Sequence, residues 1–185
     1  MPDLAGAKIA YLGFCGPIDS GGVTRLTAAI NTFVNDQFDA IYLCLSSAGG
    51  YVGDGVYLYH HIRALPIDIC LHNTGTCASI AATLFAAGKK RLASPNAIFM
   101  MHPVTVGAQT QQLSSEPLVS HLQAALAEEQ RTESILRERT KLSDALLEAR
   151  RRGELYFTAE KALEYGLIDS IAEFILPPGN KVFQI

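Results

Sequence analysis

The sequence predicts an α/β fold, in which a largely parallel β-sheet is covered by helices. Apolar, strand-like runs alternate along the chain with segments whose apolar residues recur at helical spacing. Such alternation is typical of parallel sheets, because a crossover must return the chain to the start of each new strand. In addition, a charged amphipathic segment at about 116–140 predicts one handle-like helix that is too long for a small domain.

The strands and most helices can be placed in order along the chain. The expected strands are 8–14, 40–46, 67–73 and 97–102. The first is followed by Leu26, Ile30, Phe33 and Val34 at helical spacing, the second by helix-like residues 51–65, and the third by small and apolar residues 80–87. We find no linker and no internal repeat. We therefore expect one domain over residues 1–185.

Two further helices are expected in the second half of the chain. The long helix carries one apolar side, made of Leu118, Leu122, Ala125, Leu126, Ile135 and Leu136. Such a side packs against the chain's own sheet or against another copy, and the length of the helix favours another copy. The last helix should begin after Thr158, a good N-cap residue, and stop at Gly166.

Composition excludes several classes of protein. The net charge is −3, from 15 Lys and Arg and 18 Asp and Glu, so there is no general electrostatic reason to bind nucleic acid. We interpret the short basic run at 149–153 as a solvated helix end. No apolar run approaches the roughly 20 residues of a membrane span, and residues 1–14 do not resemble a secretory signal. The 4 cysteines lie singly, without CxxC spacing, so we expect neither zinc nor disulfides and favour a cytoplasmic setting.

Reactive groups are expected at the carboxyl ends of the parallel strands. The second strand ends in Gly49 and Gly50, whose backbone can turn N–H groups toward a ligand. Ser79 follows the third strand at the start of a helix, and His102 ends the fourth. Acyl transfer needs an imidazole that accepts the serine proton and fixed N–H donors for the oxyanion. The sequence therefore favours a hydrolytic serine site at this edge.

Each of these residues alone has a simpler interpretation. A serine at this position is more often a helix cap, a histidine before a proline is more often a hydrogen-bonded loop residue, and paired glycines often form a turn. Their joint placement favours catalysis. Cys77 is the alternative nucleophile, but no charge nearby in sequence would lower its pKa, so we interpret it as a packed thiol.

Motifs for cofactors are missing from the sequence. It contains no Walker loop, no GxGxxG fingerprint and no GxSxG elbow. The remaining histidines, which are His60, His61, His72 and His121, lack ligand spacing and are interpreted as surface or packing residues. We expect no metal and no cofactor in the chain.

Four segments match a known family: "KIAYLGFCGPID", "AIYLCLSSAGG", "TGTCASIAATLFAAGKKRLASPNAIFMMHP" and "TAEKALEYGLIDSI". They resemble the proteolytic subunit of Clp protease, the ClpP family of self-compartmentalising serine peptidases. The resemblance implies a crotonase-like fold and an endopeptidase that cleaves peptides or unfolded polypeptides. It also implies seven-membered rings, stacked in pairs through the long helix, and a partner unfoldase that alone uses ATP.

The resemblance also assigns roles to residues of this chain. It implies Ser79 as nucleophile, His102 as general base and then acid, and the N–H groups of Gly50 and Ile80 as oxyanion hole. The third member of the triad would be Glu154, where the family has aspartate.

Two more departures from the family pattern concern the glycine turn and the start of the chain. Ala48 stands where the turn usually contains proline. Only Met1–Ala7 precede the first strand, whereas family members usually carry a longer segment that forms the axial gate and contributes to unfoldase docking.

Two other functions are compatible with the sequence. One is a catalytically weak or regulatory ClpP-like subunit of a mixed ring. The other is a crotonase-type acyl-CoA enzyme, because that fold hosts both chemistries. A serine followed by a base-bearing strand end argues against the acyl-CoA enzyme.

Overall fold

The computed structural model describes residues 6–105 and 115–185. Its sheet has 8 strands in the order β6-β5-β3-β2-β1-β8, with β4 paired to β3 and β7 paired to β4. The strands are β1 (Ile9–Cys15), β2 (Ala40–Ser47), β3 (Asp68–Ala78), β4 (Lys90–Ala93), β5 (Ile98–Met101), β6 (Leu155–Thr158), β7 (Ser170–Ile171) and β8 (Val182–Gln184). The helices are α1 (Ser20–Asn35), α2 (Val52–Ala64), α3 (Ile80–Phe85), α4 (Ser115–Arg139), α5 (Asp144–Arg150) and α6 (Ala159–Glu164).

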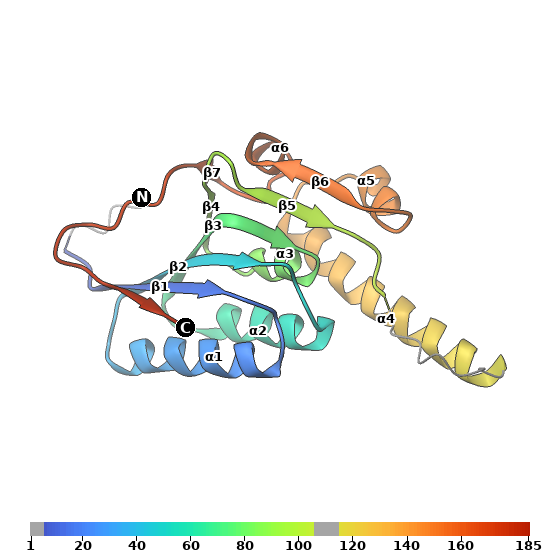
Figure 1. The fold of residues 1–185 in the computed structure, drawn as a ribbon, viewed down its shortest axis with the longest axis horizontal. Helices are drawn as coiled ribbons and strands as arrows, with labels where there is room; N and C mark the ends of the chain where they lie inside the picture. Colours follow the sequence, from blue (N-terminus) through green and yellow to red (C-terminus); the bar gives the residue numbers. More distant parts are fainter. Residues whose placement is uncertain (1–5, 106–114) are drawn as a thin grey trace.

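The predicted α/β class with a mostly parallel sheet is confirmed. Among the described strand pairs, only β5 and β6 run antiparallel. Helices α1, α2 and α3 lie together against one face of the sheet, and α4 leaves the body of the molecule at a slant (Figure 1). The main core lies between this face and the three helices. Its largest fully buried side chains include Leu12, Leu43, Leu71, Phe85 and Phe99.

Strand β3 is longer than the sequence indicates. We expected it to end at residue 73, but it continues to Ala78. Its first half pairs with β4 up to Asn73, and its second half pairs with β5 from Thr76 onward. The residues between these halves look like a turn in sequence, but pairing with a new neighbour keeps them extended. As a result, β3 ends at the residue directly before Ser79.

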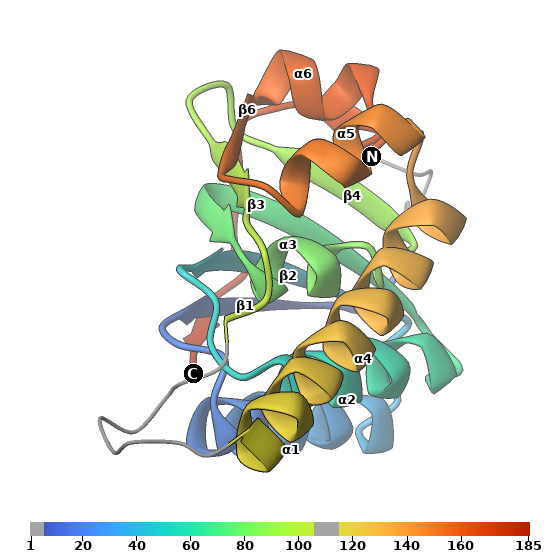
Figure 2. The same cartoon turned by 90° about the vertical axis from the view of Figure 1, so that its right-hand side faces the viewer.

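The long helix was predicted at about 116–140, and α4 occupies Ser115–Arg139. Its second half joins the core through the buried side chains of Ile135 and Leu136. Its first half extends away from the sheet (Figures 1 and 2). There Leu118, Leu122 and Leu126 are each more than half exposed, at 53%, 59% and 58%. The apolar side is therefore divided into a packed part and an uncovered part.

The predicted boundaries of the last helix are also confirmed. Thr158 accepts a hydrogen bond from the N–H of Lys161 at 3.4 Å and caps α6. Gly166 follows with a φ of 66°, the left-handed conformation that commonly stops a helix. This helix returns the chain to β7 after β6 has passed beside β5.

The sheet face opposite α1 to α3 carries a second, smaller apolar cluster around Tyr11, Tyr42 and Leu92, which Phe174 contacts. His72 lies in this layer and is fully buried. Its Nδ1 is 2.6 Å from the Tyr42 hydroxyl, and its Nε2 is 3.2 Å from the hydroxyl of Ser94. Burial lowers the pKa of His72, although a hydrogen bond at the backbone of Ala172 opposes this effect.

This buried histidine predicts a pH dependence of stability. Because the folded-state pKa is lowered, the unfolded chain binds a proton first as the pH falls below about 6.5, and stability falls there. The loss from this residue is at most about 1.4 kcal/mol per pH unit. Urea unfolding between pH 7.5 and 5.5 measures it. The free energy of unfolding of the His72→Gln variant should depend less steeply on pH. The His121→Gln variant, changed at an exposed site, is the control and should keep the slope of the parent. Equal slopes in the parent and in His72→Gln would contradict the prediction.

Candidate active site

Ser79 stands between β3 and α3 in a backbone conformation that side chains rarely adopt. Its φ is 57° and its ψ is −129°. For a residue other than glycine, such a conformation costs about 1–3 kcal/mol and persists only where the surroundings enforce it. The side chain makes no capping hydrogen bond to α3. The helix-cap interpretation of Ser79 therefore fails, and the hydroxyl is free for other partners.

The neighbouring strand brings His102 to the same edge. β3 and β5 are parallel neighbours, with Ala78 opposite Met100. The Ser79 N–H donates to the carbonyl of Met100 at 2.8 Å, which ties the turn at Ser79 to the end of β5. His102 comes two residues after Met100, just beyond the end of the strand, and is half-buried. The strand-end placement inferred from the sequence thus occurs in the fold.

The glycine turn after β2 approaches Ser79 closely. A Cβ on Gly49, whose φ is 98°, would lie 2.7 Å from the Ser79 Cβ and 2.8 Å from the Ala78 carbonyl oxygen. No side chain fits there. At Gly50 a Cβ would lie 2.1 Å from the carbonyl oxygen of Ile18. Both positions therefore require glycine, which explains "GG" at this strand end.

The N–H of Gly50 takes no part in the backbone hydrogen bonds that anchor the glycine turn to Ile18. Ile18 donates to the carbonyl of Gly49 at 2.8 Å and accepts from the N–H of Tyr51 at 2.8 Å. These bonds flank Gly50 and do not use its N–H. Ile80, the first residue of α3, is the second oxyanion candidate, because first-turn N–H groups have no partner within their own helix.

A small cavity joins these residues. It has a volume of about 50 Å³ and is lined by Gly50, Val52, Ser79, Ile80, Thr83, Met101, His102, Pro103, Val104, Thr105, Thr132 and Arg150. Nucleophile, base and oxyanion candidates thus face one space. No hydrogen bond joins His102 to Ser79 within the described part of the chain. Catalytic hydrogen bonds are often long in ligand-free sites and tighten with substrate.

Glu154 comes directly before β6, the strand that pairs with β5, but its carboxylate bonds elsewhere. Strands β5 and β6 pair with Met101 opposite Leu155, so one more step of this register would set His102 opposite Glu154. The side chain of Glu154 is exposed. Its Oε2 accepts a hydrogen bond from the Tyr156 hydroxyl at 2.7 Å. An extension of this register would therefore bring the backbone of Glu154 beside His102, as a catalytic triad requires. The carboxylate, however, is hydrogen-bonded to Tyr156 instead of the imidazole.

Cys77 is fully buried, and burial raises its pKa, with its Sγ 3.8 Å from the carbonyl oxygen of Leu45. A buried thiol with a raised pKa is a poor nucleophile. Burial likewise raises the pKa of Cys44 to about 11 and that of Cys70 to about 12. Among the described residues, no three His, Cys, Asp or Glu side chains gather as a metal site requires.

Sequence reasoning missed three polar residues beside this cavity. Arg150 belongs to the basic run that we interpreted as solvated, but it is only 5% exposed; Arg151 and Arg152, which follow it, are exposed. Thr132 and Glu129 on α4 are also buried and lie beside Arg150. No signal in the sequence separates them from their neighbours, because most residues in this part of α4 are polar. Only the packing of α5 on α4 shows that they are buried.

The model of the family described as Clp protease matches residues 8–174. The chain therefore belongs to the Clp protease family, a family of proteases with a ClpP or crotonase fold. Proteins of this family need no cofactor and are typically oligomeric. Within residues 6–105 and 115–185, no helix has the length and apolar character needed to cross a bilayer.

Proposed function

We propose that this chain is a serine endopeptidase that cleaves peptides or unfolded polypeptides within a ring-shaped oligomer. The observation that carries the proposal is the conformation of Ser79. Its backbone is strained, its hydroxyl caps nothing, and it faces a cavity that His102 also lines. Strain of this kind clusters at functional sites. Residues 1–185 act as one peptidase domain.

The chemistry follows from the positions of these groups. His102 takes the proton of the Ser79 hydroxyl as its oxygen attacks the scissile carbonyl carbon. The N–H groups of Gly50 and Ile80 stabilise the oxyanion of the tetrahedral intermediate. His102 then gives the proton to the leaving amine. His102 next takes a proton from water as the water oxygen adds to the acyl carbon, and it returns this proton to the oxygen of Ser79 as the bond to the acid product breaks. Glu154 orients the imidazole throughout.

A fluorophosphonate probe tests this function directly, because only an activated serine reacts with it. We expect stoichiometric labelling, mapped by mass spectrometry to the peptide that contains Ser79. Hydrolysis of a fluorogenic peptide should stop as labelling proceeds. Labelling elsewhere, or none on a folded protein, would reject the proposal.

A second candidate is a catalytically weak or regulatory subunit of a mixed ring. The hydrogen bond between Glu154 and Tyr156 favours it, since a carboxylate held there does not orient His102. Such a subunit would label slowly and gain activity only with a sister subunit. An ATP-driven unfoldase remains the proposed partner in either case.

The uncovered part of α4 predicts assembly. Leu118, Leu122 and Leu126 expose an apolar stripe that a second subunit would bury. In light scattering at micromolar concentration, the particle should therefore weigh several times the 20.0 kDa of one chain. The Leu122→Glu/Leu126→Glu variant should shift toward smaller species. Ser120→Glu, on the same helix at an exposed polar site, is the control; a monomeric parent would contradict the prediction.

A further inference from the structure

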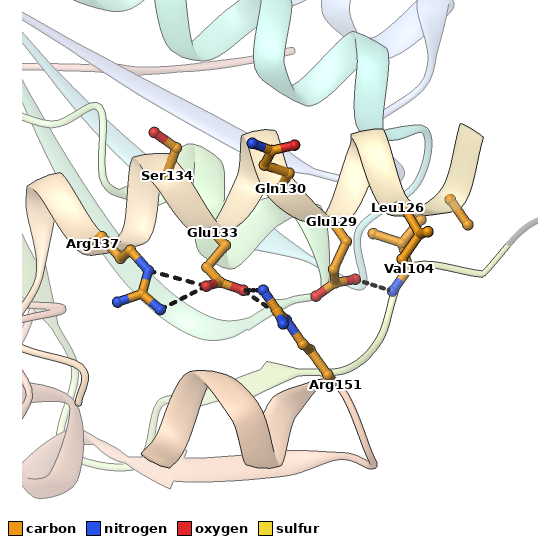
Figure 3. Close-up of a pocket in the computed structure, with 9 residues that line it drawn as sticks. Val104, Leu126, Glu129, Gln130, Glu133, Ser134, Arg137 and Arg151 are labelled. Atoms are coloured by element: carbon orange, nitrogen blue, oxygen red, sulfur yellow. Dashed lines mark hydrogen bonds and ion pairs between the residues drawn. The ribbon is translucent and has the colours of Figure 1, made fainter. Parts of the chain in front are cut away.

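Beyond Met101 the backbone that carries His102 has left the sheet, and another contact fixes it. Val104, two residues after His102, donates its N–H to Oε2 of Glu129 on α4 at 2.8 Å (Figure 3). Glu129 is only 8% exposed. A hydrogen bond from a backbone N–H to a carboxylate is about twice as strong as one between neutral groups. Val104 also lines the cavity that contains Ser79 and His102.

The other oxygen of Glu129 reaches α5. Its Oε1 lies 3.0 Å from Nη2 of Arg150 in an ion pair, and the same Nη2 donates a hydrogen bond to Oγ1 of Thr132 at 3.0 Å. Arg150 is the last residue of α5, four positions before Glu154. Burial lowers the pKa of Arg150, while Glu129 and Glu133 raise it. The arginine thus supplies the buried counter-charge of Glu129, while the hydrogen bond to Val104 is the one that Oε2 accepts.

We propose that Glu129 is a positioning residue for catalysis, which places the imidazole of His102 by binding the Val104 N–H. This inference rests on the proposed peptidase function and deepens it. General-base catalysis tolerates little displacement, since a shift of about 1 Å can cost about 100-fold in rate. The contact also joins the long helix to the active site inside one subunit.

The chain offers a matched control one turn further along α4. Glu133 is also buried, and it pairs with Arg151 at 2.7 Å and with Arg137 at 2.8 Å (Figure 3). Both glutamates therefore join α4 to arginines at the end of α5. Of the two, only Glu129 forms a hydrogen bond to the described residues that follow His102, which are 103–105. A merely structural role would affect both positions alike.

Two double variants isolate the hydrogen bond to Val104. Glu129→Leu/Arg150→Leu removes both charges and the acceptor, whereas Glu129→Gln/Arg150→Leu removes both charges but keeps an acceptor oxygen. Neither leaves an unpaired buried charge, which is what makes single changes of such pairs costly. Peptide hydrolysis by the full chain should show a kcat at least about tenfold lower in the first variant, with KM within about threefold of the parent. The second variant should recover most of the kcat, and Glu133→Leu should keep it.

A second measurement does not depend on catalysis. Hydrogen exchange followed by mass spectrometry reports the Val104 amide in peptides covering 102–105, where Pro103 has no N–H. Exchange should be slow in the parent, in Glu129→Gln/Arg150→Leu and in Glu133→Leu, and fast in Glu129→Leu/Arg150→Leu. Equal kcat and equal exchange in the two double variants would overturn the inference. If the parent neither hydrolyses peptides nor labels at Ser79, the proposed function fails, and exchange at Val104 alone then decides whether Glu129 positions this segment.

Discussion

A Ser79→Ala protein should lose peptide hydrolysis by at least about four orders of magnitude and should not react with a fluorophosphonate. Loss of the nucleophile removes the acyl-enzyme route altogether. The fold should be unaffected, because the hydroxyl makes no capping bond and alanine suits the same backbone no worse than serine does. Initial rates, probe labelling and a thermal melt of the same sample measure these three expectations.

His102→Ala should cause comparable damage. Residues that act as one catalytic unit are not additive, so the double variant should be little slower than either single one. Cys77→Ala controls for the alternative nucleophile and should leave the rate unchanged, because this thiol is buried and its pKa is raised. Hydrolysis by Ser79→Ala at a rate near that of the parent would remove Ser79 from the mechanism.

Replacement of Glu154 by glutamine should lower kcat by about two orders of magnitude or more, with the fold retained. A carboxylate that accepts the second imidazole N–H fixes the tautomer and stabilises the imidazolium as it forms. One more step of the β5–β6 register, beyond Met101 and Leu155, would set Glu154 opposite His102. Its side chain is longer than that of aspartate by about 1.5 Å, and the Cβ direction of Gly153 is open, with no atom within 4 Å, so the backbone there has room to adjust. Steady-state kinetics of peptide hydrolysis measure the effect.

Tyr156 provides the matched comparison. In the ligand-free structure its hydroxyl holds the Glu154 carboxylate at 2.7 Å. A Tyr156→Phe change frees this carboxylate and should raise kcat or leave it unchanged, since Tyr156 itself is exposed. If Glu154→Gln works as fast as the parent, this carboxylate does not orient the histidine. A Glu154→Asp variant faster than the parent would show that the longer side chain is a handicap.

The parts of the site that depend on local pattern could be predicted from sequence. Strand ends in parallel sheets meet at one edge whatever the details of packing, so Ser79, His102 and Gly50 could be placed together from the order of the elements. Local signals also gave the limits of α4 and α6. Register in an antiparallel pair is different, because it depends on contacts between segments distant in the chain. The pairing of Met101 with Leu155, one step short of His102 and Glu154, was therefore visible only in the fold.

The same limit explains the errors. Strand β3 continues beyond residue 73, its predicted end, because its second half pairs with β5, which lies more than twenty positions further along the chain. Arg150 was interpreted as solvated, since an arginine in a basic run is rarely buried. A charged side chain is rarely buried unless a group of opposite charge lies beside it. Glu129 is that partner, on a different helix.

Strand β8 has a consequence for how the molecule meets its proposed substrates. It pairs with β1 from Tyr11 to Gly13 and so occupies one end of the sheet. An open strand edge binds extended polypeptide indiscriminately, by main-chain hydrogen bonding alone. For a peptidase, each such edge would be a place where substrate is retained without being cut. With β1 covered, the described sheet ends in three short strands: β8 itself, β7 on the branch through β4, and β6. Of these three, β6 pairs with β5, the strand that leads to His102, so an extended chain that added to β6 would lie close to the candidate catalytic residues.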